Sequence, residues 1–171
     1  HCDSAQPQLC AQDNGIFGCG YNSDMTEQAP NSHITAAIWH WNVYYQTAIE
    51  TAMTCGDPAN FVTAMGGAAY YAGLAENFVD TSALNEATAA PNTAAVMDAV
   101  RALIVSGEWD VFSGVKLSYD IAEDGTVTVN KTDAPLMTND GTEIVAAGGP
   151  SVDDGVITGS MNYNVEGVVV S

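Results

Sequence analysis

The sequence predicts an α/β fold, and the order of its first elements carries this prediction. Patterns typical of a strand end, a short helix and a second strand follow one another within residues 1–25. A further β-type run at 33–40 then leads directly into an amphipathic helix at 41–55. Strands that alternate with helices are typical of α/β domains.

The first helix is predicted over residues 4–15. Ser4 is a suitable N-cap, Pro7 lies early in the segment, and Asn14-Gly15 is a common helix end. The apolar run 16–21 predicts a strand, which ends in the polar turn 22–24.

The helix predicted at 41–55 has Tyr44, Ala48, Ile49 and Ala52 at helical spacing and ends at Gly56-Asp57-Pro58. A second clear helix starts after Pro91-Asn92 and ends before Gly107, with an apolar stripe that includes Val96, Val100 and Leu103.

The remaining segments predict short strands and one hairpin. Glu123-Asp124-Gly125 separates two alternating runs, which indicates a β-hairpin. The predicted strands are 61–65, 68–72, 77–80, 115–121, 126–131, 142–146 and 163–170, with a helical turn after Ser151.

Composition limits the classes of partner. The 171 residues include 3 Lys or Arg and 21 Asp or Glu, which gives a formal net charge of −18. Such a surface repels phosphate backbones and anionic headgroups, so we expect no nucleic-acid partner and no basic membrane-docking patch. The 47% hydrophobic content predicts a folded chain.

The start of the sequence indicates a piece of a larger protein, and the cysteines leave their pairing open. His1-Cys2-Asp3-Ser4 resembles the end of a strand whose beginning is absent, although a cleaved leader would also explain the first residue. Cys2, Cys10, Cys19 and Cys55 allow three disulfide pairings or none, and no C-x-x-C pair is present.

Asp24 is the first candidate for ligand binding. It follows a predicted strand at its carboxyl end, where open α/β sheets form their ligand crevice, and a carboxylate there can accept hydrogen bonds from two vicinal hydroxyls. An ordinary turn residue is the alternative interpretation. Asp3, at the preceding strand end beside His1, has the same placement and the same alternative.

An aromatic cluster is the second candidate. Trp39, Trp41, Tyr44 and Tyr45 gather where a strand leads into a helix, and a planar base could stack on them, unless they only pack in the core.

Metal binding and catalysis have weaker support. His33 and His40 are predicted to point to opposite faces, and His1 chelates copper only if its amine is free. The catalytic motifs G-x-S-x-G, H-E-x-x-H, G-x-G-x-x-G and the P-loop are absent from the sequence.

Several segments, in the same order, resemble the basic membrane protein (BMP) family, the substrate-binding lipoproteins of ABC importers that are similar to purine-nucleoside receptors. The resemblance lies in His1-Cys2-Asp3-Ser4, Phe17 to Met25, Ala29-Pro30, His33-Ile34-Thr35-Ala36, Trp39-His40-Trp41, Tyr44-Tyr45, Gly107-Glu108-Trp109, Val111-Phe112-Ser113-Gly114, Ser151 to Asp154 and Met161 to Val168.

This resemblance implies a type I periplasmic-binding-protein fold, in which two Rossmann-like lobes close on a ligand. The chain would be its carboxyl-terminal portion, without the half that supplies much of the first lobe. Residues 1–55 would finish the second lobe, and residues 56–171 would provide crossover segments, a first-lobe helix with its strands, and a hairpin and strand tail.

The resemblance also implies roles for single residues. Asp24 would hold a ribose or a polar ligand edge, while Asn22 stands where many relatives have an acid. His1 and Asp3 would face the cleft, and Trp41 would approach it. Gly66 and Gly67 would line the crossover side, and segment 116–140 receives no role.

The function implied is capture of a nucleoside or purine-like solute and its delivery to ABC permease subunits. No enzyme activity, cofactor or metal is expected. The protein would lie outside the cytoplasmic membrane, held by a lipid anchor on the missing amino terminus. Two alternatives are a sensory receptor of the same fold and a secreted metal-dependent enzyme that uses His1, His33 and His40.

Overall fold

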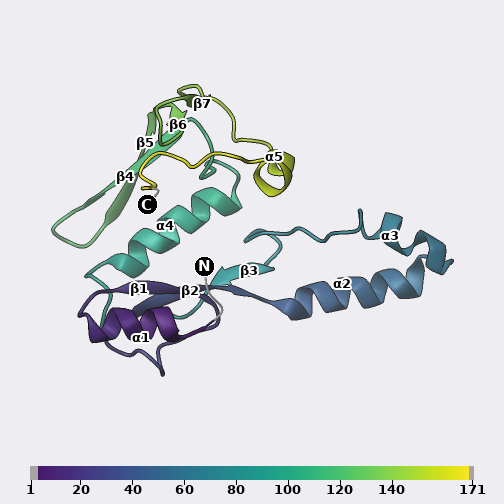
Figure 1. Cartoon of the computed structure of the whole chain (residues 1–171), viewed down its shortest axis with the longest axis horizontal. Coiled ribbons are helices and arrows are strands. Elements are labelled where there is room, and N and C mark those ends of the chain that lie inside the picture. Colours follow the sequence, from purple (N-terminus) through teal and green to yellow (C-terminus); the bar gives the residue numbers. More distant parts are fainter. Residues whose placement is uncertain (1–3, 170–171) are drawn as a thin grey trace. The chain divides into compact units, whose positions relative to one another are not determined.

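The computed structural model describes residues 4–169 and divides the chain into two compact units, His1–Pro91 (unit 1) and Asn92–Ser171 (unit 2). Both units mix helices with small sheets, so the predicted α/β class is confirmed at this level. Figure 1 shows the order of the elements along the chain. The predicted division at residue 55 concerns the lobes of a larger fold and stays a prediction.

Unit 1 is built on a three-stranded sheet with the order β1-β2-β3. Its strands are β1 (Gly18–Asn22), β2 (His33–Trp39) and β3 (Val79–Thr81). β1 and β2 run parallel and β3 runs antiparallel to β2. The parallel pair places the carboxyl ends of β1 and β2 side by side, as an α/β fold requires.

The first helix, α1 (Gln6–Asp13), packs against β1 in the part of the structure that is purple in Figure 1. It ends where the sequence predicts, because Gly15 adopts a left-handed φ of 65° that a helix cannot continue. Gln8 and Ala11 are its buried residues, and the Gln8 side chain donates to the Cys19 carbonyl at 2.8 Å.

The core of unit 1 lies between the sheet, α1 and the loop that joins β1 to β2. Its buried apolar residues are Ala11, Met25, Ala29, Ala36 and Phe78. A one-residue irregularity in the β1–β2 register brings His33 and Ala36 to the same glycine, Gly20, where an added Cβ would meet the His33 ring at 2.9 Å.

The second helix, α2 (Trp41–Thr54), follows β2 directly and confirms the predicted helix 41–55. Residues 61–65 were predicted as a strand, and this is wrong. Asp57 accepts a hydrogen bond from the Ala59 amide at 2.9 Å and Pro58 fixes the first turn, so a 3₁₀ turn η1 (Pro58–Asn60) leads into the helical turn α3 (Phe61–Ala64). The cap and the proline outweigh the β propensity of the residues that follow.

The segment 68–72 was also predicted as a strand, and it has no regular structure. The glycines before it explain the error, because Gly66 and Gly67 have left-handed φ values of 85° and 146° and redirect the chain. The predicted strand 77–80 exists as β3, shifted by two residues at its start, because Asn77 has a left-handed φ of 55°.

Unit 2 consists of the helix α4 (Thr93–Val105), two hairpins and a short helix, α5 (Asp154–Gly159). The predicted helix 92–106 and the predicted hairpin are both confirmed. β4 (Val115–Ile121) pairs with β5 (Val127–Asp133) antiparallel, and α4 packs against β5. β6 (Leu136–Met137) pairs with β7 (Glu143–Val145).

The predicted strand at 163–170 is wrong for its described part. Residues 163–169 contribute one isolated bridge, Thr138 to Val165, and then turn at Gly167 with a φ of 84°. A valine-rich run without a neighbouring strand to pair with cannot form a ladder.

Among the described residues, α1 to α5 are each too short or too polar to cross a bilayer.

Candidate functional site

The carboxyl ends of β1 and β2 form the edge at which the sequence places its ligand-binding residues. Asn22, the last residue of β1, stands opposite Ile38 in the parallel register, so the loop after β1 and the start of α2 leave the sheet at neighbouring positions. Ligands of α/β sheets bind outside the carboxyl ends of strands.

Asn22 turns the chain at this edge. Its φ of 72° lies in the left-handed region, which asparagine tolerates better than other residues with side chains. The turn itself therefore favours an asparagine at this position.

Asp24 is half-exposed, and its neighbour Thr26 holds it in place. Its Oδ1 accepts hydrogen bonds from the Thr26 amide at 2.8 Å and from the Thr26 hydroxyl at 2.6 Å. These two bonds, with a smaller contribution from His33, hold the pKa of Asp24 below its ordinary value of 3.8. Asp24 is therefore an Asx-turn residue, as the alternative interpretation of the sequence predicts, and its carboxylate stays ionised at neutral pH, while its role in ligand binding stays a prediction.

His33, at the start of β2, is fully buried beneath the loop that carries Asp24. Its Nε2 lies 3.4 Å from the Met25 amide nitrogen and 3.5 Å from Asp24 Oδ1, while the buried Nδ1 has no hydrogen-bond partner among the described residues. Burial lowers the pKa of His33 below its ordinary 6.5, and Asp24 opposes this with a smaller effect. The neutral ring, with Nε2 accepting from the Met25 N–H, is thus the favoured state.

The sequence did not predict that His33 is buried and accepts a hydrogen bond from the Met25 amide, because His33 was considered only as a candidate metal ligand. The available signal was Gly20, since a glycine within a strand often marks the close approach of another group.

Three members of the predicted aromatic cluster, Trp39, Trp41 and Tyr44, line a cavity of about 560 Å³ in unit 1. Its walls are Trp39, Trp41, Tyr44, Tyr70, Tyr71, Ala72, Phe78 and Val79. Trp41 meets Phe78 edge to face with ring centroids 5.6 Å apart, and Phe78 meets Tyr70 in the same way at 5.3 Å. Edge-to-face pairs of this kind fix the orientation of the rings.

Three of these rings could not be found from local sequence. The irregular segment before β3 supplies Tyr70, Tyr71 and Phe78. Because β3 pairs antiparallel with β2, this segment lies next to the start of α2. Tyr45, which the sequence grouped with the cluster, does not line the cavity and is 59% exposed on α2.

The structure does not join all predicted site residues into one site. The described interactions of Asp24 are with Thr26 and His33, and neither residue lines the aromatic cavity. His1 and Asp3 lie outside the described residues. Gly66 and Gly67 lie between α3 and the cavity-lining segment and do not line the cavity.

The metal hypothesis finds no cluster within residues 4–169, where no group of three or more His, Cys, Asp or Glu side chains could hold an ion. His40 instead precedes α2, with its Nδ1 3.0 Å from the Asn77 carbonyl oxygen. Cys10, Cys19 and Cys55 are free thiols, and Cys2 lies outside the described residues.

A scan of the chain against models of known protein families gives no match, and a search of curated proteins likewise gives none.

Proposed function

We propose that this chain is the carboxyl-terminal portion of the substrate-binding component of an ABC importer, and that it captures a nucleoside or purine-like solute. The observation that carries the proposal is the aromatic cavity at the carboxyl end of β2. It has the size of a small-molecule site and is walled by rings whose orientations are fixed by one another.

The cavity suits a planar base because stacking needs flat apolar walls. Each well-placed aromatic contact contributes about 0.5–1.5 kcal/mol beyond the burial of its area. Trp41 combines a ring that is 50% exposed with a place in the wall, so it is available to a ligand and still held by Phe78.

The polar end of the ligand is assigned to the loop after β1. Asp24 is ionised and its Oδ1 is engaged by Thr26, so a sugar hydroxyl would donate to Oδ2. Hydrogen bonds to a charged acceptor are roughly twice as strong as neutral ones. Asn22, His1 and Asp3 belong to the same proposed edge.

The remaining parts of the proposal follow from the family that the sequence resembles. The solute would be enclosed by lobe closure, without covalent chemistry or cofactor, outside the cytoplasmic membrane on a lipid-anchored protein. The permease subunits would bind the closed form better than the open form and so couple capture to transport.

The test is a titration of the full-length protein, of which this chain would be the carboxyl-terminal portion, with a panel of nucleosides and free bases, followed by tryptophan fluorescence and calorimetry. We expect purine compounds to bind. Trp41→Ala should weaken the binding of nucleosides and of free bases alike by about tenfold, or about 1.4 kcal/mol. Ile49→Ala is the matched control, because Ile49 is 61% exposed on the same helix and lies outside the cavity. Absence of binding by every compound would reject the proposal.

Asp24 is tested with the same panel. Asp24→Ala should weaken the binding of ribose-bearing ligands by about 1.5–3 kcal/mol and leave the binding of free bases unchanged. Asp24→Asn keeps an oxygen for Thr26 and removes the charge, so it separates a ligand contact from a turn effect. Equal losses for bases and nucleosides would contradict the ribose assignment.

A further inference from the structure

One face of α2 is apolar and exposed beyond its first turn. Tyr45, Ile49 and Met53 recur every four residues, and their exposed fractions are 59%, 61% and 81%. We call these three residues the α2 stripe. Residues four apart on a helix are neighbours, so the α2 stripe is a continuous surface.

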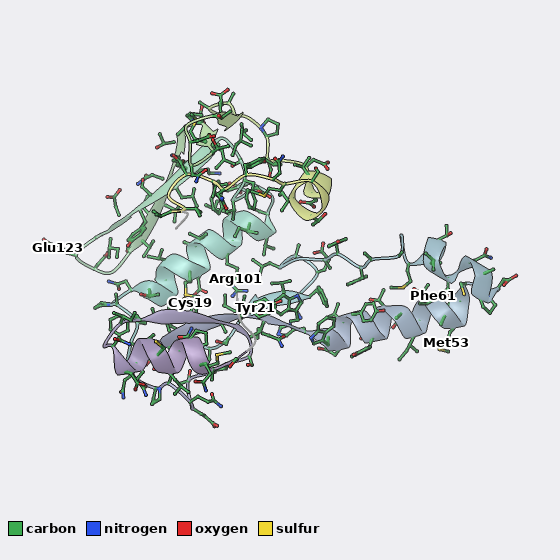
Figure 2. All side chains as sticks on the ribbon, in the orientation of Figure 1. Cys19, Tyr21, Met53, Phe61, Arg101 and Glu123 are labelled. Carbon is green, nitrogen blue, oxygen red and sulfur yellow. The ribbon has the colours of Figure 1, made fainter. Side chains whose placement is uncertain are left out.

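The α2 stripe lies away from the contacts that α2 makes within unit 1. α2 packs on α3, and Figure 2 shows Met53 on the side of α2 that faces away from Phe61 of α3. None of the 14 residues of α2 is buried. A helix normally turns its apolar face to the core and its polar face to water, so this arrangement indicates an interaction surface.

Charge identifies the kind of partner. Arg101, Lys116 and Lys131 are the cations of the sequence and all belong to unit 2, so unit 1 combines nine Asp or Glu residues with no Lys or Arg. Glu50 is exposed next to Ile49, and Asp57 follows the end of the helix. The last turn of α2 carries no basic residue, so no side chain of that turn compensates the negative end of the helix dipole near Met53.

These observations disfavour a second copy of the chain as the occupant. Two such surfaces would bring like charges together around the apolar contact. A partner with an apolar face flanked by cationic side chains would instead cover the α2 stripe and pair with the acidic residues near it.

We propose that the α2 stripe docks a basic amphipathic helix of a partner protein. The apolar face of that helix covers Ile49 and Met53, and its Lys and Arg side chains meet Glu50 and the carboxyl end of α2. This site is independent of the solute proposed for the aromatic cavity, since Tyr45, Ile49 and Met53 do not line the cavity.

The experiment measures binding of the whole chain to a synthetic helical peptide of about 20 residues, with leucines on one face and lysines elsewhere. A peptide with the same leucines and glutamates in place of lysines tests the charge. We expect the basic peptide to bind, the acidic peptide not to bind, and affinity to fall as salt is raised above roughly 0.15 M.

The double variant Ile49→Gln with Met53→Gln tests the surface, and we expect it to weaken the basic peptide by about tenfold or more. Both side chains are exposed, so the fold should persist. Ile16→Gln is the matched control, because Ile16 is 58% exposed in the same unit and lies outside α2. It should bind like the parent chain.

Two results would overturn the proposal. Equal binding by all variants would mean a non-specific attraction of cations to an acidic surface. Sedimentation showing that the parent chain self-associates, and that the double variant does not, would assign the α2 stripe to a second copy instead.

Discussion

Unit 1 holds all the buried apolar side chains among the described residues, whereas unit 2 is organised around the backbone of one glycine. Unit 1 also has the buried polar residues Gln8, Ser32, His33 and Ser82, while the buried polar residue of unit 2 among the described residues is Thr138. In unit 2, Gly114 donates to the Gly149 carbonyl and accepts from the amides of Ala134 and Gly148, at 2.7 to 3.0 Å.

The difference shows how each unit compensates for a small core. Unit 1 adds side-chain hydrogen bonds to buried backbone, as when Ser82 Oγ accepts from the Ala36 amide at 2.9 Å and Thr88 donates to the His33 carbonyl at 2.6 Å. Unit 2 joins its two hairpins by main-chain bonds that require close approach. The two units should therefore respond to different perturbations.

The largest effect is expected at Gly114. A Cβ there would lie 1.9 Å from the Ala146 carbonyl oxygen, which is backbone and cannot rotate away. We expect Gly114→Ala to lower the free energy of unfolding of unit 2 by about 3 kcal/mol or more. Chemical denaturation followed by the fluorescence of Trp109, which belongs to unit 2, measures this change.

Gly159→Ala is the matched control for that measurement. Gly159 ends α5 in the same unit, and an added Cβ there meets no atom within 4 Å. Its effect should be small. A Gly114→Ala protein as stable as the parent chain would show that unit 2 does not depend on this close approach.

An intermediate effect is expected from acid on unit 1, through His33. The folded pKa of His33 lies below the ordinary 6.5, so the unfolded chain binds the proton first as the pH falls. Stability is full above about pH 6.5 and is lost as the pH falls through the folded pKa, by about 1.4 kcal/mol for each unit between the two values. Asp24, whose folded pKa is also lowered, acts in the same direction at lower pH.

NMR titration of the His33 imidazole in the parent chain measures this directly. His33→Gln should flatten the dependence of unfolding free energy on pH below about pH 6.5, whereas His40→Gln should retain it. A His33 that titrates at or above its ordinary value would contradict the prediction, whether or not the variant folds.

The smallest effect is expected at the ion pair between Lys131 and Glu108 of unit 2. Their charged atoms are 3.1 Å apart, but the side chains are 39% and 62% exposed. We expect Lys131→Gln to change the stability of unit 2 by less than about 0.5 kcal/mol, and a double-mutant cycle with Glu108→Gln to give a coupling of similar size. A larger coupling would mean that unit 2 also depends on side-chain pairs.

Local patterns predicted the helices α1, α2 and α4 and the β4–β5 hairpin correctly. The Asp124-Gly125 turn needs only its own residues, since Gly125 has a φ of 84° and Asp124 accepts from the Thr126 amide at 2.9 Å. The same local patterns failed at 61–65 and 163–169. In the first segment a cap and a proline outweighed β propensity, and the second had no strand to pair with.

The candidate site was predictable only in part. Asp24 and Trp41 were found because strand ends and aromatic runs are visible in the sequence. The part of the cavity wall formed by Tyr70, Tyr71 and Phe78 and the burial of His33 could not be predicted, because they depend on contacts between segments that are distant in the sequence. Tyr70 and Phe78 reach the cavity through the pairing of β3 with β2.

The sequence by itself determined the charge of −18, the placement of all three cations after residue 91, and the amphipathic patterns of α2 and α4. These properties depend on composition and on the helical period alone. The tertiary structure decided which side of α2 stays exposed, which rings face one another, and that His33 is buried beside Asp24. Those outcomes depend on register and close packing, because a single bulge or glycine changes which side chains meet.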